Sequence, residues 1–262
     1  MDLLIVGSND DSFCEEVSEL VKYKGYTSVI LDIYDAAKLF SIAIADGKSD
    51  VTPNIPVILR IPSQAPIRTS FDDSFMYGEC LATLWAATTL SKSIVINRPT
   101  ATSLWGKISY SSSLTKLKAG DNNSNVEIFS SQVSSSPQLL MNKQWYLQDL
   151  ITYNTAAYPQ IPEGVGPFRA SWVDSNLEYE IIVVLEDKAW RCSNVKLEYL
   201  RLEEKSISLL RNLDLVFGTV TWSIDSNLEN ATIAQINPYP SLEEIQFVWS
   251  AFAPALLETI FS

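Results

Sequence analysis

The sequence predicts an α/β protein, with a parallel sheet in about its first hundred residues and an antiparallel α+β arrangement in the remainder. Short apolar runs alternate with helix-like stretches up to Asn97, and Gly or Pro separates them. From Gln144 onward the pattern changes to strands joined by polar turns. A third observation limits the chemistry, because the chain of 262 residues contains no histidine.

Four strands and three helices are expected before residue 100. Short apolar runs place the strands at 3–6, 27–33, 56–62 and 93–97. The first helix is expected to be capped by Ser12 and to end at Gly25, and the second to cover 34–45. The third is expected to begin at Asp72 or Asp73 and to end near residue 90. This alternation predicts a four-stranded parallel sheet with helices on both faces.

The chain is expected to divide into three parts, which are 1–119, a polar linker or reduced lobe over 120–143, and 144–262. Ser and Asn are frequent between 120 and 138 and apolar residues are few, which is typical of a linker. The last part is expected to hold a hairpin over 177–192, strands over 215–224 and 231–236, and helices over 197–210 and 242–261.

Charge and cysteine content exclude several classes of partner. The chain has 19 Lys and Arg against 31 Asp and Glu, a net charge of −12. Such a surface repels phosphate backbones and anionic lipid, so no nucleic-acid or membrane partner is expected. Polar residues interrupt the apolar start after Val6, unlike a secretion signal. Three widely spaced cysteines are typical of a reducing compartment. We therefore expect a cytoplasmic protein.

Absent residue types and motifs exclude several kinds of site. Without histidine, the chain cannot build a Ser-His-Asp triad or a histidine-ligated zinc site. The 9 glycines form neither GxGxxG nor GxxxxGK, so both common glycine-rich phosphate loops are missing. Proton transfer would have to use carboxylates, Lys, Tyr or Cys.

Two blocks of sequence, and a hairpin between them, carry a family pattern. The first block consists of a strand over 57–62, a helix with Glu79 and Trp85, the strand and turn over 95–101, and Lys107. The second is Leu213-Asp-Leu-Val-Phe-Gly-Thr-Val-Thr221, followed by Ala234-Gln-Ile-Asn-Pro-Tyr-Pro-Ser241, and the hairpin covers 178–191. Together they resemble a shortened member of the ATP-grasp superfamily, in its peptide-modifying branch of microviridin-type ligases.

The resemblance implies a pre-ATP-grasp domain followed by a reduced ATP-grasp domain, and it implies roles for individual residues. Lys107, Arg191 and Asn237 match positions that handle the phosphates and metal of ATP. Arg60 and Arg98 are candidates for substrate binding, because they end parallel strands where ligands gather in open α/β sheets. Lys107 could equally be a solvated helix lysine, and the two arginines could form ordinary surface ion pairs.

The departures from the family pattern concern the metal site and the phosphate flap. Family members place an acid on the first closing strand and a Glu on the second, and both hold Mg²⁺, which prefers charged oxygen ligands. The matching residues here are Thr221 and Gln235, and Asn237 alone is kept. The glycine-rich flap expected between 119 and 144 contains a single glycine, Gly120.

Other polar and sulfur-bearing residues are expected to be structural. Glu178 and Glu180 alternate along one strand, and we interpret them as a solvent-facing edge rather than a carboxylate pair. Cys80 and Cys192 are expected to be buried, unreactive thiols. The loop at Gly164 is expected to have no phosphate role.

Two functional hypotheses follow from the resemblance. The favoured one is a degenerate ATP-grasp-like protein that acts as a non-catalytic binding or scaffold partner in peptide or natural-product modification, with no cofactor. The alternative is a divergent ATP-dependent carboxylate–amine ligase that works through an acyl phosphate and needs ATP and Mg²⁺. A protein or peptide partner is expected in either case. A homodimer is expected because the helix over 242–261 is apolar nearly all round.

Overall fold

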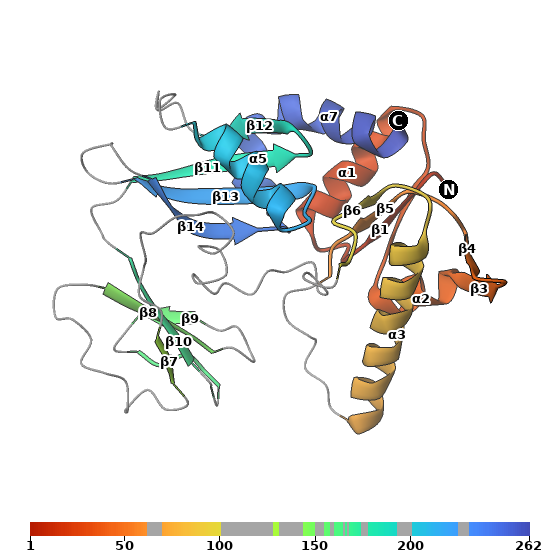
Figure 1. Cartoon of the computed structure of the whole chain (residues 1–262), viewed down its shortest axis with the longest axis horizontal. Coiled ribbons are helices and arrows are strands. Elements are labelled where there is room, and N and C mark those ends of the chain that lie inside the picture. Colours follow the sequence, from red (N-terminus) through yellow and green to blue (C-terminus); the bar gives the residue numbers. More distant parts are fainter. Residues whose placement is uncertain are drawn as a thin grey trace.

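The structure is a computed structural model, and the residues that it describes form three four-stranded sheets and one two-stranded hairpin (Figure 1). It describes residues 1–61, 70–100, 128–130, 144–149, 155–157, 160–164, 166, 168–173, 178–192, 201–224 and 231–262.

The first sheet has the strand order β2-β1-β5-β6 and is parallel throughout, as the sequence predicts. Its strands are β1 (Leu3–Val6), β2 (Ser28–Leu31), β5 (Val57–Leu59) and β6 (Val95–Ile96). Helices α1 (Ser12–Tyr23) and α7 (Trp249–Phe261) pack on one face, and α2 (Ile33–Leu39) and α3 (Phe71–Leu90) on the other. The prediction of helices on both faces is therefore confirmed.

Two details of this half differ from the sequence prediction. The second helix ends at Leu39 instead of residue 45, and a hairpin of β3 (Ser41–Ala45) and β4 (Lys48–Thr52) follows it. The alternation of Ser41-Ile-Ala-Ile-Ala45 and the Asp46-Gly47 turn outweigh helix propensity there, because both turn residues adopt positive φ, at 52° and 71°.

The helix caps also differ from those predicted. Asp11, rather than Ser12, caps α1 by accepting a hydrogen bond from the Phe13 amide. Ser70, rather than Asp72 or Asp73, caps α3 by accepting from the Asp73 amide at 3.1 Å. In both cases a short polar side chain lies one residue before the helix, as N-capping requires.

The second sheet is antiparallel, with the order β12-β11-β13-β14. Its strands are β11 (Glu178–Leu185), β12 (Lys188–Arg191), β13 (Phe217–Ile224) and β14 (Ala231–Asn237), which confirms the predicted hairpin and closing strands. Helix α5 (Leu202–Asn212) begins five residues later than the expected 197 and buries Leu209 and Leu210 against one sheet face. The other face packs on α7.

The third sheet is antiparallel and has the order β7-β10-β8-β9. Its strands are β7 (Ile128–Ser130), β8 (Gln144–Asp149), β9 (Thr155–Ala157) and β10 (Phe168–Val173). Strand β7 falls inside the range 120–143 that was expected to be a linker or reduced lobe. The remainder of that range lies outside the described residues, and the prediction of three domains stays a prediction.

The parallel and second sheets share one hydrophobic core. Leu3 and Ile5 of β1 belong to the same buried cluster as Leu185 of β11 and Phe217 of β13. The expected C-terminal helix is present in three segments, α6 (Leu242–Ile245), a 3₁₀ turn (Gln246–Val248) and α7. Phe252, Leu256 and Ile260 of α7 are almost completely buried in this core. None of the helices in the described part of the chain has the length and apolar content to cross a bilayer.

Candidate functional site

The candidate metal residues gather on one face of the second sheet. Across β13 and β14, Thr219 lies opposite Asn237 and Thr221 lies opposite Gln235. Directly opposed residues of an antiparallel pair point to the same face, so these four side chains share it. The strand register shifts immediately after Thr221, as at a β-bulge, a feature common beside functional sites. Thus the structure brings together Asn237, Thr221 and Gln235.

Asn237 is hydrogen-bonded at both ends of its amide by its own chain. Its Oδ1 accepts from the Tyr239 amide at 3.0 Å, and its Nδ2 donates to Oε2 of Glu244 at 3.0 Å. Thr219 Oγ1 donates to the other carboxylate oxygen of Glu244. The reversed amide orientation would place Oδ1 against a carboxylate, so these partners fix how Asn237 points.

Glu244 is a member of this group that the sequence analysis missed. It lies on α6 and its amide donates to Ser241 Oγ, the N-cap, at 3.2 Å. Ser241-Leu-Glu-Glu244 matches the capping-box pattern, which is typical of a helix start. Because that pattern already accounts for the glutamate, the sequence gives no sign of a further role. In the structure the Glu244 carboxylate instead reaches across to β13 and β14.

The residues present do not fit a Mg²⁺ site of the kind that the family pattern implies. Mg²⁺ demands octahedral oxygen ligands and is usually held by carboxylates. Thr221 and Gln235 are neutral, and the carboxylate of Glu244 already accepts two hydrogen bonds. Within the described residues, no three His, Cys, Asp or Glu side chains are grouped as a metal site would need.

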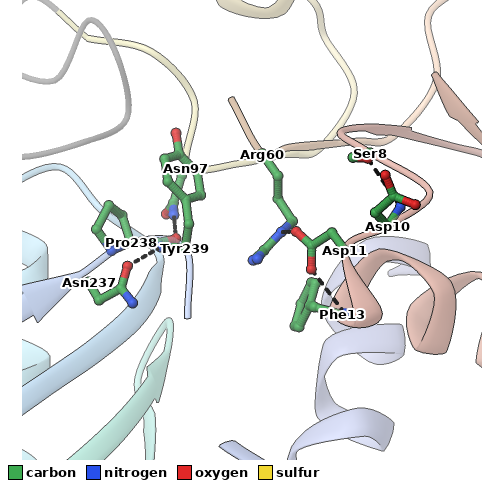
Figure 2. A network of polar contacts seen from close by, with 9 residues as sticks. All are labelled: Ser8, Asp10, Asp11, Phe13, Arg60, Asn97, Asn237, Pro238 and Tyr239. Carbon is green, nitrogen blue, oxygen red and sulfur yellow. Dashed lines mark hydrogen bonds and ion pairs between the residues drawn. The ribbon is translucent and has the colours of Figure 1, made fainter. Parts of the chain in front are cut away.

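Asn97 ties this group to the parallel sheet. It directly follows β6, is 2% exposed, and adopts a left-handed conformation with φ of 54°. Its Nδ2 donates to the carbonyls of Phe217 and Pro238 at 2.9 and 3.0 Å. Its Oδ1 accepts from the amides of Val216 and Phe217 at 3.2 and 3.0 Å. One side chain therefore fixes the start of β13 and the turn after β14 against β6. Figure 2 shows its bond to Pro238.

Arg60 lies on the other side of Tyr239, at the end of the parallel sheet (Figure 2). It is 8% exposed, and its Nε donates to Asp11 Oδ2 at 2.7 Å. Its guanidinium lies 4.4 Å from the ring centre of Phe13 and 6.0 Å from that of Tyr239. Its buried Nη1 has no hydrogen-bond partner among the described residues. Arg60 is thus a buried cation at the site, and a substrate role for it stays a prediction.

Two buried groups beside Arg60 are held in their neutral forms. Burial, followed by the nearby Asp11 charge, raises the pKa of Cys14 to about 12. Burial raises the pKa of Tyr239 above its usual range, against the opposing effect of Arg60. Neither group is therefore suited to act as a nucleophile at neutral pH.

Arg98 points away from this group and closes the end of α3. Its Nη1 donates to the carbonyls of Thr88, Thr89 and Ser91 at 2.6, 3.1 and 2.8 Å, and its Nη2 donates to Ser93 at 2.7 Å. The last carbonyls of a helix lack partners and carry partial negative charge, which a cation stabilises. Burial lowers the pKa of Arg98. The structure thus gives Arg98 a helix-capping position, and does not bring it together with Arg60.

Arg191 and Asn237 lie on opposite faces of the second sheet. Arg191 pairs with Ile182, which packs under α5, whereas Thr219 and Asn237 face the other way. Two nitrogens of Arg191 bind the two carboxylate oxygens of Glu203 on α5, and this pairing lowers the pKa of Glu203. The structure therefore does not bring Arg191 to the candidate metal residues. Lys107 and most of the expected flap lie outside the described residues.

The interpretation of Glu178 and Glu180 as one solvent-facing edge is wrong for Glu180. Glu178 is exposed, but Glu180 is 1% exposed, because it lies opposite Trp222 on the sheet face that α5 covers. All three cysteines are free, and Cys14 is buried, whereas Cys80 and Cys192 are half-buried and not buried as expected. Burial, with Glu180 and Glu244 nearby, raises the pKa of Cys192 to about 11, consistent with the expected unreactive thiol.

No model of a known protein family matches the sequence, and no curated protein is similar to it. Solved structures do resemble its fold. The macrocyclase MdnC from Microcystis aeruginosa MRC, bound with precursor peptide MdnA, matches with a TM-score of 0.69 at 11% identity, over 99% of this chain and 98% of that chain. The ATP-grasp ligase PsnB, complexed with precursor peptide PsnA2 and AMPPNP, matches with a TM-score of 0.66 at 10% identity, over 100% and 99%.

A third similar structure is a RiPP-associated ATP-grasp ligase from Chryseobacterium gregarium in complex with ADP and a leader and core peptide. It matches with a TM-score of 0.64 at 11% identity, over 99% of this chain and 96% of that chain. The protein therefore has the fold of the ATP-grasp peptide-modifying ligases, as the resemblance in the sequence implies.

Proposed function

We propose that this chain is a non-catalytic ATP-grasp-like protein that acts as a binding or scaffold partner in peptide or natural-product modification. The observation that carries the proposal is the group formed by Thr221, Gln235 and Asn237. Two of these residues are neutral where the family pattern has acids, and the third is hydrogen-bonded at both ends of its amide. The proposal therefore includes no Mg²⁺ and no ATP as cofactors.

The proposed partner is a peptide or protein. Support comes from the fold, because two of the structures with this fold are complexes with precursor peptides and a third is a complex with a leader and core peptide. Nucleic acid is disfavoured by the net charge of −12. A cytoplasmic location remains part of the proposal, and the free state of all three cysteines is consistent with it.

A divergent ATP-dependent carboxylate–amine ligase, working through an acyl phosphate, is the second candidate. One observation favours it, which is the Glu244 carboxylate 3.0 Å from Asn237 Nδ2. This carboxylate could replace one of the two missing acids, and each of its oxygens keeps acceptor capacity beside the hydrogen bonds from Thr219 and Asn237. The first candidate is favoured because Glu244 would supply only one of the two acids, and the neutral Thr221 and Gln235 leave the second one missing.

A rescue experiment tests the first candidate. The double variant Thr221→Asp with Gln235→Glu restores both acids, and calorimetry with ATP and Mg²⁺ measures the result. We expect Mg²⁺-dependent ATP binding at least tenfold tighter than in the wild type, since each charge-assisted contact contributes roughly 1.5–3 kcal/mol. The control Thr52→Asp with Ala82→Glu adds two charges at exposed positions of β4 and α3 and should leave binding unchanged. ADP release by the wild type with a precursor-type peptide would instead support the ligase.

A homodimer remains a prediction, although the apolar C-terminal helix no longer gives the main reason for it. Phe252, Leu256 and Ile260 of the C-terminal helix pack in the chain's own core and are not free to contact a second copy, whereas Phe247 is 75% exposed. Light scattering at micromolar concentration decides the question, and a monomer mass would end the prediction.

A further inference from the structure

The first half of α3 exposes large apolar side chains. Phe71, Phe75 and Met76 are 83%, 63% and 56% exposed. The start of α3 extends beyond the parallel sheet and past α2 (Figure 1), and the contact with α2 is made on the inner face, by Tyr77. An exposed cluster of this kind differs from a single surface phenylalanine, because neighbouring apolar side chains together favour burial by a partner.

Helical geometry places these residues on the side of α3 that faces away from the core. Tyr77, Leu81 and Leu84 are at most 2% exposed and form the inner face. At 100° per residue, Phe71 and Phe75 fall on the opposite face. A Cβ added at Gly78 on that face would meet nothing within 4 Å. Among the residues that the structure describes, nothing covers the outer face along about two turns.

The outer face is acidic as well as apolar. Asp72 and Glu79 are exposed on the same side, next to Phe71 and Phe75. Helix α3 contains no Lys or Arg, and the whole chain carries a net charge of −12. A complementary surface would combine apolar side chains with positive charge.

We propose that the outer face of α3 docks a basic amphipathic segment of a partner peptide or protein. Apolar residues of the segment would cover Phe71, Phe75 and Met76, and its Lys or Arg side chains would approach Asp72 and Glu79. A second copy of this chain fits less well, because self-pairing would bring the same acids together between two bodies of charge −12. The inference deepens the proposed binding role, since it names the partner's chemistry and its surface.

Fluorescence anisotropy with a labelled probe peptide tests this proposal. The probe is an amphipathic helical peptide of Leu and Lys, compared with a scrambled peptide and with an analogue in which Glu replaces Lys. We expect Phe71→Ser with Phe75→Ser to weaken probe binding about tenfold or more. Tyr23→Ser, which alters an 85% exposed aromatic residue on α1, should leave binding unchanged.

A charge variant tests the acidic component separately. Asp72→Asn with Glu79→Gln should weaken binding about threefold at low salt and less at high salt, because salt screens exposed charges. Glu15→Gln with Glu19→Gln, which removes two exposed acids from α1, is the matched control.

Three results would overturn the docking proposal. They are equal losses in the variants and their controls, equal binding of the acidic or scrambled peptide, or no probe binding by the wild type. If light scattering finds a dimer that Phe71→Ser with Phe75→Ser dissociates, a second copy covers the face and the proposal is also wrong. ATP and Mg²⁺ binding is measured separately, so a failure here is distinguishable from a failure of the proposed non-catalytic role.

Discussion

The side chain of Asn97 joins the parallel sheet to the second sheet through four hydrogen bonds. Its amide bonds four backbone groups of the second sheet and its neighbouring turn while it is almost fully buried. The sequence analysis identified Asn97 only as the end of a strand, because a pattern of apolar residues cannot show which distant backbone a side chain will reach.

We predict that Asn97→Ala lowers the free energy of unfolding by about 3 kcal/mol or more, because it leaves several buried backbone groups without partners. Alanine also tolerates the positive φ at this position less well than asparagine. Urea denaturation measures the change. The control Asn9→Ala, at an exposed position, should change stability by less than about 0.5 kcal/mol. A similar effect of both variants would contradict the stabilising role of the Asn97 hydrogen bonds.

The Arg191–Glu203 pair predicts a pH-dependent contribution to stability. Pairing lowers the Glu203 pKa below its ordinary 4.5, so the stabilisation is fully present above that value and is lost as the pH falls through the lowered pKa. Glu203→Gln should cost about 1 kcal/mol at about pH 7, allowing for partial exposure of Glu203, and less at about pH 3. Denaturation at both pH values measures this. Glu204→Gln, in an exposed pair, should show little change at either.

At the residue scale, sequence reasoning identified part of the candidate site. Thr221, Gln235 and Asn237 were singled out from the motif, and the structure places them on one face. Glu244 was missed, since a capping box explains its presence without any contact to β13 or β14. Arg191 was grouped with them because of the family resemblance. It pairs with Ile182, however, and side chains alternate between faces along a strand, so Arg191 lies on the other face.

At the scale of elements, the local sequence pattern predicted the strands and helices better than it predicted which distant strands pair. The four parallel strands were correctly predicted because each is an apolar run bounded by Gly, Pro or polar residues. The β3–β4 hairpin was missed although Asp46-Gly47 is a strong turn signal, because Tyr34 to Ala45 was interpreted as one helix. Pairing of β7 with β10 joins residues far apart in sequence, which local patterns cannot show.

Two glycines give a paired prediction about the packing of elements. A Cβ at Gly218 of β13 would lie 2.8 Å from the Asn237 carbonyl oxygen and 3.3 Å from Pro238 Cα, so the end of β14 would have to shift. We expect Gly218→Ala to destabilise the protein by about 2 kcal/mol. Gly78→Ala, at an open position of α3, should instead stabilise it by about 0.5–1 kcal/mol. Thermal denaturation measures both, and a stabilising Gly218→Ala would contradict the described close approach.

At the scale of the whole molecule, the parallel and second sheets form one packed unit. Residues of β1, α1, β13 and α7 share a buried cluster, and Asn97 bonds across the same boundary. This packing holds the turn at Asn237 beside the end of the parallel sheet, where Arg60 lies. The residues at this junction are therefore fixed by packing and hydrogen bonds, and two residues of the neighbouring group, Thr221 and Gln235, are neutral where the family pattern has acids.

Calorimetric titration of the wild-type protein with ATP in the presence of Mg²⁺ tests the central claim most directly. Loss of two charge-assisted contacts at roughly 1.5–3 kcal/mol each predicts binding about 10²- to 10⁴-fold weaker than a micromolar site. We therefore predict a dissociation constant in about the millimolar range, or no measurable heat. Binding at low micromolar concentration would contradict the account and would make the protein a candidate ligase.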